Sequence, residues 1–202
     1  MKTAHTDNAN NDVRQNILAH GHRIIAGKGF AAVGINEVLT AAGVPKGSFY
    51  HYFGSKDAFG EALLERYFEA HWLECDALLS TPNLSAAQRL ILYWENWKSA
   101  QLMNNCEGKC LTVKLGAEVA DLSETMRLAL QRGTTGITNR LSAAIKAGLS
   151  DGSLSIKEPP YETAENLYQL WLGASVLVKI TRAPRPFEMA MAATRQMLHV
   201  QP

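Results

Sequence analysis

Residues 44–53 read VPKGSFYHYF, and this stretch decides how the whole chain is interpreted. Pro45 is predicted to open a short helix, because its fixed φ suits the first helical position. A second short helix is predicted just before it, over residues 35–42. Gly43 fits the tight turn between the two, because glycine adopts left-handed backbone conformations without strain. Two short helices joined by such a turn are typical of a helix-turn-helix unit that binds DNA.

Apolar and polar side chains have separate roles in this unit. The apolar residues can form a small core against a preceding helix; they are Val38, Leu39, Val44, Phe49 and Phe53. Four side chains are then left to contact phosphates and base edges: those of Lys46, Ser48, Tyr50 and His51. Gly47 would allow the helix backbone to approach the duplex closely, and Lys56, at the start of the next helix, would add a phosphate contact.

The rest of the chain has sequence patterns typical of helices. Residues 1–11 are polar and lack periodicity, so we expect a flexible tail there. Apolar residues at helical spacing follow from Val13, and Ser85 with Gln88 forms a capping-box pattern before another apolar helix. The sequence therefore predicts an all-α protein of about nine helices. It would have a three-helix DNA-binding domain over residues 12–56 and a larger helical domain for effector sensing and dimerisation over residues 57–202.

Composition and charge describe a globular chain with a basic N-terminal part. Of its residues, 47% are hydrophobic and 19% charged. Residues 1–56 hold six Lys or Arg against three Asp or Glu, whereas the remainder holds 14 against 16. The longest nearly uncharged apolar run, residues 170–178, is too short to span a bilayer, and the N-terminus lacks the pattern of a secretion signal. We therefore expect a cytoplasmic protein without a membrane partner.

Residues 29–30, 35–39 and 42–59 together resemble the signature of the TetR family of transcriptional repressors. The resemblance implies a homodimer that binds a palindromic, double-stranded DNA operator and that an effector releases. The DNA-contact positions of the family fall on Lys46, Ser48, Tyr50, His51 and Lys56. One departure concerns the start of the second helix: the family usually has Thr or Ser there, and this chain has Val33-Gly34, which lacks a hydroxyl cap.

The chain has three cysteines, at positions 75, 106 and 110, and an odd number argues against a disulfide framework. If residues 110–114 are helical, Cys110 and Lys114 share a face, and the ammonium would favour the reactive thiolate. The alternative is that Cys110 is an inert, buried apolar residue.

Two further segments, residues 108–127 and 170–182, resemble a TetR subgroup that includes the repressor of the N-ethylmaleimide reductase operon. Members of this subgroup respond to electrophiles and oxidants through cysteine. The resemblance implies that Cys110 is the sensing thiol, and it places Lys179 in a matched segment as a candidate neighbour. Cys106 completes the candidate effector site.

Two other effector types stay open. A reversible apolar ligand could bind among large side chains of the body, namely Trp94, Trp97, Met103, Met126 and Trp171. A metal sensor would require His71-x3-Cys75 and Cys106-x3-Cys110 to converge into one ligand set. No nucleophile elbow, phosphate loop, dinucleotide fingerprint or paired-histidine motif occurs, so we expect neither an enzyme nor a cofactor.

The segment 167–179 is apolar on nearly all sides of a helix, and such a helix must be buried. Together with the helix predicted over residues 187–198 it is a candidate dimer interface, in the form of a four-helix bundle. The alternative is a helix in the centre of the monomer.

Overall fold

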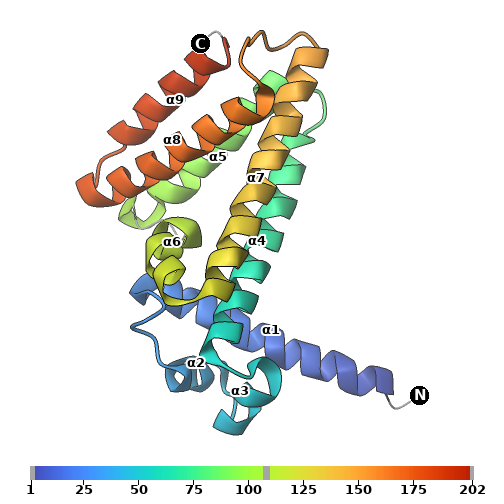
Figure 1. The fold of residues 1–202 in the computed structure, drawn as a ribbon, viewed down its shortest axis with the longest axis vertical. Helices are drawn as coiled ribbons and strands as arrows, with labels where there is room; N and C mark the ends of the chain where they lie inside the picture. Colours follow the sequence, from blue (N-terminus) through green and yellow to red (C-terminus); the bar gives the residue numbers. More distant parts are fainter. Residues whose placement is uncertain (1–2, 107–109, 201–202) are drawn as a thin grey trace. The chain divides into compact units, whose positions relative to one another are not determined.

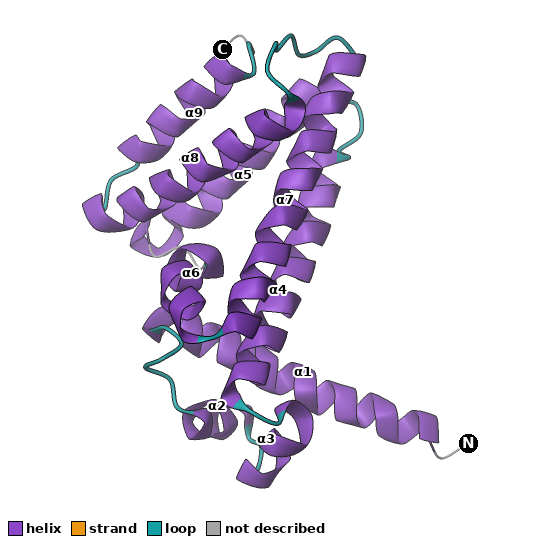
Figure 2. Cartoon of the chain, viewed as in Figure 1, coloured by secondary structure: helices purple, strands orange, loops and turns teal. Residues whose placement is uncertain are grey.

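The computed structural model describes the backbone of residues 3–106 and 110–200. In these ranges the chain forms helices and loops only, and no strand (Figures 1 and 2). The helices are α1 (Thr3–Lys28), α2 (Ile35–Ala42), α3 (Lys46–Phe53), α4 (Lys56–Leu79), α5 (Ala86–Cys106), α6 (Leu111–Leu122), α7 (Glu124–Ser150), α8 (Pro160–Thr181) and α9 (Arg185–Met197). The prediction of an all-α fold with about nine helices is confirmed.

Local capping signals set several helix ends where the sequence predicts them. Gly43 ends α2 with a left-handed φ of 67°. The Ser55 hydroxyl oxygen accepts the N–H of Ala58 in the first turn of α4, at 3.0 Å. Before α5, the Ser85 N–H donates to the Gln88 side chain at 2.9 Å, and the Gln88 N–H donates to the Ser85 hydroxyl at 3.3 Å. This is the reciprocal pairing of a capping box.

The start of α1 differs from the prediction. The helix begins at Thr3, so the segment expected to be a tail, residues 1–11, is helical from Thr3 onward. The apolar period that signals this helix begins only at Val13. Adding residues to an existing helix costs far less than nucleating one, so polar residues can extend it without an apolar stripe of their own.

By packing, the chain divides into two compact units. One contains residues 1–68 and 114–131, and the other contains residues 69–113 and 132–202. The domain boundary at residue 56, where a helix begins, stays a prediction. By packing, the first half of α4 and the segment 114–131 belong with α1–α3, and helices α4, α6 and α7 each contribute residues to both units.

The first unit is built around the aromatic residues of α3 and α4. Phe49, Phe53 and Phe59 are buried, and their ring centroids lie 5.1–5.6 Å apart. Burial of one such side chain contributes roughly 1.5–3 kcal/mol. The Asn16 side chain of α1 donates to the carbonyl of Ala42 at 2.9 Å and so ties α1 to the end of α2.

Glu118 of α6 holds the loop that follows α1 in the same unit. Its two carboxylate oxygens accept the backbone N–H groups of Ala31 at 2.7 Å and of Phe30 at 3.3 Å. These N–H groups lie beyond the end of α1, and the carboxylate gives them acceptors from another helix. Gly29 precedes them with a φ of 92°, and a Cβ there would lie 3.0 Å from the same carboxylate.

The second unit has a core rich in tryptophan, contributed by α5, α8 and α9. Trp94 and Trp171 are stacked at 4.8 Å, and Trp171 stacks on Phe187 at 5.5 Å. The Trp171 indole donates to the Thr194 hydroxyl at 2.8 Å. The paired indole nitrogen makes this burial favourable, because an indole without an acceptor would lose its bond to water.

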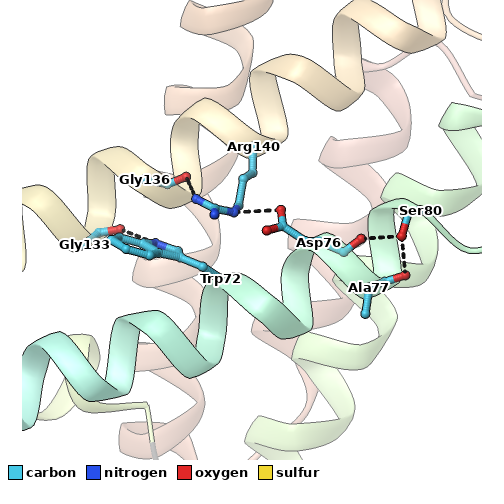
Figure 3. A network of polar contacts seen from close by, with 7 residues as sticks. All are labelled: Trp72, Asp76, Ala77, Ser80, Gly133, Gly136 and Arg140. Carbon is cyan, nitrogen blue, oxygen red and sulfur yellow. Dashed lines mark hydrogen bonds and ion pairs between the residues drawn. The ribbon is translucent and has the colours of Figure 1, made fainter.

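A polar network joins α4 to α7 within this unit (Figure 3). Arg140 donates to Asp76 at 2.7 Å and to the Gly136 carbonyl at 3.1 Å, and its guanidinium lies 5.0 Å from the centre of the Trp72 ring. Trp72 in turn donates to the Gly133 carbonyl at 3.2 Å. A Cβ at Gly136 would lie 2.6 Å from the Trp72 ring, so only glycine allows this close approach.

The Glu118 contact yields a stability prediction. Replacing Glu118 by Ala leaves two backbone N–H groups without their acceptors, and we expect the free energy of unfolding to fall by about 1–3 kcal/mol. Glu118→Gln keeps one acceptor oxygen and should lose less. Urea denaturation at one fixed protein concentration measures both variants. Equal stability of Glu118→Ala and the wild type would show that the contact does not stabilise the loop.

Candidate nucleic-acid interface and thiol site

Helix α3 is amphipathic across its short length. Phe49 and Phe53 are buried, whereas Lys46, Gly47 and His51 are exposed. The Tyr50 side chain is 60% exposed, and its ring packs edge-on against Phe49 at 5.4 Å. Ser48 is half-buried. Most of the residues predicted to contact DNA therefore share the outer face of one helix.

Gly47 has no role in packing within the chain. A Cβ built at this position meets nothing within 4 Å. Glycine inside a helix costs roughly 0.5–1 kcal/mol relative to alanine. No contact within the chain therefore requires glycine at position 47. This agrees with the prediction that glycine lets the helix backbone approach the DNA duplex closely.

The stretch of sequence that carries α3 contains basic residues and no acidic ones. No Asp or Glu occurs between Glu37 and Asp57, a range that holds Lys46, His51 and Lys56. The Lys56 ammonium lies 4.8 Å from the centre of the Phe30 ring, a cation–π contact that holds this half-buried side chain in place. DNA contact by Lys56 stays a prediction.

Helix α2 begins without a side-chain cap, as the sequence predicts. Gly34 occupies the N-cap position in an extended conformation, and no side chain caps the helix. The first turn instead carries Glu37, which pairs with Lys28 at 2.5 Å. A hydroxyl contact from this position to a phosphate is therefore unavailable to this chain.

The structure alters the local argument for the Cys110 thiol. Helix α6 begins at Leu111, so Cys110 lies just before it and is not helical. The condition for Cys110 and Lys114 to share a helix face is therefore not met, and Lys114 is exposed. Lys179 is half-buried on α8. The side chain of Cys106 lies outside the described residues.

Cys110 and Cys75 are both buried, at 8% and 0% exposure, and neither forms a disulfide. Burial, reinforced by the neighbouring charge of Asp76, raises the pKa of Cys75 to about 12. At neutral pH this thiol carries a negligible thiolate fraction, and only the thiolate is nucleophilic. Cys75 is therefore a structural residue.

The five residues considered for a reversible ligand do not all lie in one unit, and one of them is exposed. Trp94, Trp97 and Trp171 form one cluster in the second unit. Met103 is 64% exposed, and Met126 lies in the other unit against Gly60. The expectation that all five residues line a pocket is therefore wrong for Met103, because periodicity alone does not tell whether a residue is buried.

Two tyrosines that the sequence analysis does not single out complete the tryptophan cluster. Tyr93 lies 4.7 Å from Trp94, and Tyr168 lies 5.8 Å from Trp97. The pattern Tyr93-Trp94-x-x-Trp97 on α5 could have predicted that Tyr93 joins this cluster, since residues three and four apart share a helix face. The contribution of Tyr168 from α8 depends on tertiary packing.

No group of three or more metal-ligating side chains converges among the residues that the structure describes. His71 pairs with Glu74 at 3.8 Å, and burial lowers the pKa of His71. The predicted metal-ligand set of His71, Cys75, Cys106 and Cys110 includes Cys106, whose side chain lies outside the described residues. In the same part of the chain, no helix is long and apolar enough to cross a membrane.

Comparison with known proteins matches both parts of the chain. Residues 17–63 match the family of bacterial regulatory proteins of the tetR type, and residues 86–194 match a tetracycline repressor-like C-terminal domain. The chain is 40% identical to the HTH-type transcriptional repressor NemR of Escherichia coli K12, over 93% of this chain and 94% of that protein. It is 31% identical to the transcriptional regulator AcuR of Cereibacter sphaeroides, over 85% of this chain and 78% of that protein.

Solved structures agree with these matches. The crystal structure of E. coli NemR in its reduced form has a TM-score of 0.90 and 39% identity, and the match covers 94% of this chain and 98% of that one. A regulatory protein TetR from Rhodobacter sphaeroides has a TM-score of 0.82 and 30% identity, with 91% and 97% covered. The chain therefore belongs to the TetR family of bacterial transcriptional repressors.

Proposed function

We propose that this repressor binds a palindromic operator as a homodimer through α3, and that an electrophile or oxidant that modifies Cys110 releases it. Membership of the TetR family makes the chain a regulator rather than an enzyme. The main support for DNA binding is the set of side chains exposed on the outer face of α3. There Lys46, Tyr50 and His51 project from a helix whose other face is locked by buried phenylalanines.

Dimerisation is supported by the exposed face of α8. Its exposed positions include 162, 166, 169, 173, 176 and 180, which alternate in steps of four and three. This is the spacing with which two helices pack along a shared seam. The stripe is apolar toward its end, where Val176 and Ile180 are 43% and 71% exposed, and Met189 of α9 is 60% exposed. Helices α8 and α9 lie side by side (Figure 1), and exposed apolar residues on both fit a four-helix interface.

Gly173 lies in the middle of this stripe. A Cβ there meets nothing within 4 Å, so the monomer has no packing reason for a glycine inside α8. A small residue at the seam of two helices lets their backbones approach closely. The position therefore supports a partner helix at this face.

Thiol sensing is supported by the position of Cys110. The residue directly precedes α6, where the first N–H groups of a helix lack internal partners and interact favourably with negative charge. Cys75, the other described thiol, is fully buried and has its pKa raised to about 12. The similar E. coli NemR structure is described as a reduced form. That description distinguishes states of that repressor by their oxidation, which agrees with sensing through a thiol.

The DNA-binding part is tested by removing single donors from α3. Lys46→Ala and His51→Ala should each weaken binding about fivefold to fiftyfold, and the Lys46 variant should flatten the salt dependence. Fluorescence anisotropy with a duplex selected from random sequence measures this. Lys157→Ala removes an exposed lysine from the other unit and is the matched control. Unchanged affinity of both α3 variants would refute docking through this face.

The dimer interface is tested by charge insertion. Ile180→Asp should raise the dimer dissociation constant at least about a hundredfold, because the carboxylate would be desolvated without a partner. Leu73→Asp alters a leucine that is 72% exposed on α4 and should leave the dimer intact. Sedimentation velocity over a concentration series separates the two. A stable Ile180→Asp dimer would exclude this face.

The sensing part is tested by replacing the thiol. Cys110→Ser should bind the operator as the wild type does, but treatment with N-ethylmaleimide should no longer weaken binding. In the wild type we expect a loss of about a hundredfold, equivalent to roughly 3 kcal/mol of coupling. Cys75→Ser is the matched control and should respond normally. Full release of Cys110→Ser would refute Cys110 as the sensor and direct attention to Cys106.

A further inference from the structure

Arg14 of α1 occupies a position where the helix pattern calls for an apolar residue. The buried positions of residues 11–28 lie on one face of the helix, and they are Ile17, Leu18, Gly21 and Ile25. Arg14 lies three and four residues before the first two of these, so it falls on the same face. The side chain is half-buried, and its guanidinium lies 5.3 Å from the centre of the ring of Phe53, the last residue of α3.

Three other half-buried arginines have acceptors, and Arg14 does not. Arg66 and Arg89 each donate to a backbone carbonyl, at 3.1 and 2.8 Å, and Arg140 donates to a carboxylate at 2.7 Å. Arg14 donates no hydrogen bond to any residue that the structure describes and forms no ion pair with one. A guanidinium carries five N–H donors. Those of Arg14 are therefore left for water or for a partner outside the chain.

Neighbouring contacts fix the rotation of α1 where it carries Arg14. The carbonyl of Gln15 accepts a bond from α4 at 3.1 Å, and the Asn16 side chain donates to the end of α2 at 2.9 Å. The Phe53 ring against which the guanidinium lies is itself buried. The charge of Arg14 is thus held in place before a partner binds, and a side chain that is already ordered loses less entropy on binding.

The place of Phe53 at the end of α3 indicates what the partner is. With 8 residues, α3 is about 12 Å long, and the major groove of DNA is about 12 Å wide. When α3 lies in that groove, side chains beside its ends are within reach of the phosphates that border the groove. Arginine suits phosphate because two parallel N–H groups can bind its oxygens. Asp12, the nearest acidic residue on α1, is two residues away and does not face Arg14.

We propose that Arg14 binds a backbone phosphate of the operator beside the end of α3, with its guanidinium held against the Phe53 ring. The inference rests on the proposed DNA binding through α3, and it adds α1 to the surface that contacts DNA. The contact neutralises one phosphate per protomer and reads no base, so it adds affinity without sequence preference. Lys56 is held in a similar way, with its ammonium 4.8 Å from the centre of the Phe30 ring.

The salt dependence of operator binding tests this contact. Arg14→Met keeps a long side chain against Phe53 and removes the charge and the donors. We expect the affinity to fall about fivefold to fiftyfold. The slope of log K against log salt concentration should become shallower by about 1.8, since a dimer loses two phosphate contacts at about 0.9 each. Fluorescence anisotropy with the selected duplex over a series of salt concentrations measures both. An unchanged slope would overturn the inference.

Arg23→Met is the matched control on the same helix. Arg23 is exposed and lies nine residues after Arg14, which is about two and a half helical turns, so the two arginines point to opposite sides of α1. The control should leave the affinity and the slope unchanged. Equal changes in both variants would mean that binding responds only to the net charge of α1, and would overturn the inference.

A conservative variant separates phosphate binding from a structural role. Arg14→Lys keeps the charge and should have the wild-type slope. The Tm of Arg14→Met should fall by less than about 4 °C, because the side chain makes no hydrogen bond to a described residue. A larger fall in Tm with an unchanged slope would mean that Arg14 supports the fold instead. On a duplex of scrambled sequence Arg14→Met should lose affinity by the same factor as on the operator. A loss confined to the operator would overturn the inference.

The α3 variants Lys46→Ala and His51→Ala distinguish failure of this inference from failure of the proposed function. If they weaken binding and Arg14→Met leaves the slope unchanged, docking through α3 stands and the Arg14 contact fails. If Arg14→Met flattens the salt dependence and neither α3 variant weakens binding, the phosphate contact of α1 stands and docking through α3 fails. If none of the three variants changes binding, both proposals fail.

Discussion

The packing of Phe49 and Phe53 against Phe59 is the contact on which the proposed recognition surface depends. A helix as short as α3, Lys46–Phe53, is not stable in isolation, because nucleation costs more than so few hydrogen bonds return. Its two buried rings supply the missing free energy and also fix the rotation of the helix. The exposed positions of Lys46, Tyr50 and His51 follow from that rotation.

A second constraint acts through α6. The helix begins at Leu111, directly after Cys110, and carries Glu118, whose carboxylate holds the backbone of residues 30–31. A helix transmits a displacement along its axis, since its hydrogen bonds resist internal deformation. Under the proposed thiol sensing, α6 is the helix that directly follows the modified residue, and the same helix holds the loop after α1.

Several residues reduce stability without an evident gain inside the monomer. Gly47 and Gly173 weaken their helices without relieving any internal contact. Tyr93 and Trp94 place donors in the core without acceptors. Natural sequences violate local rules mainly at functional positions, where the loss of stability is offset by binding. The two glycines lie at the proposed DNA and dimer surfaces.

The sequence by itself determined the helical fold, the ends of α2 and α3, the caps before α4 and α5, and the residues that α3 exposes. These features depend on neighbouring residues: Gly43 at a left-handed turn, Ser55 at a cap, and an apolar period one helix long. Tertiary structure decided that Cys110 precedes α6, that Met103 is exposed, and that the Tyr93 hydroxyl is unpaired. Each depends on which side chains from distant parts of the chain share one core, and local spacing carries no information about that.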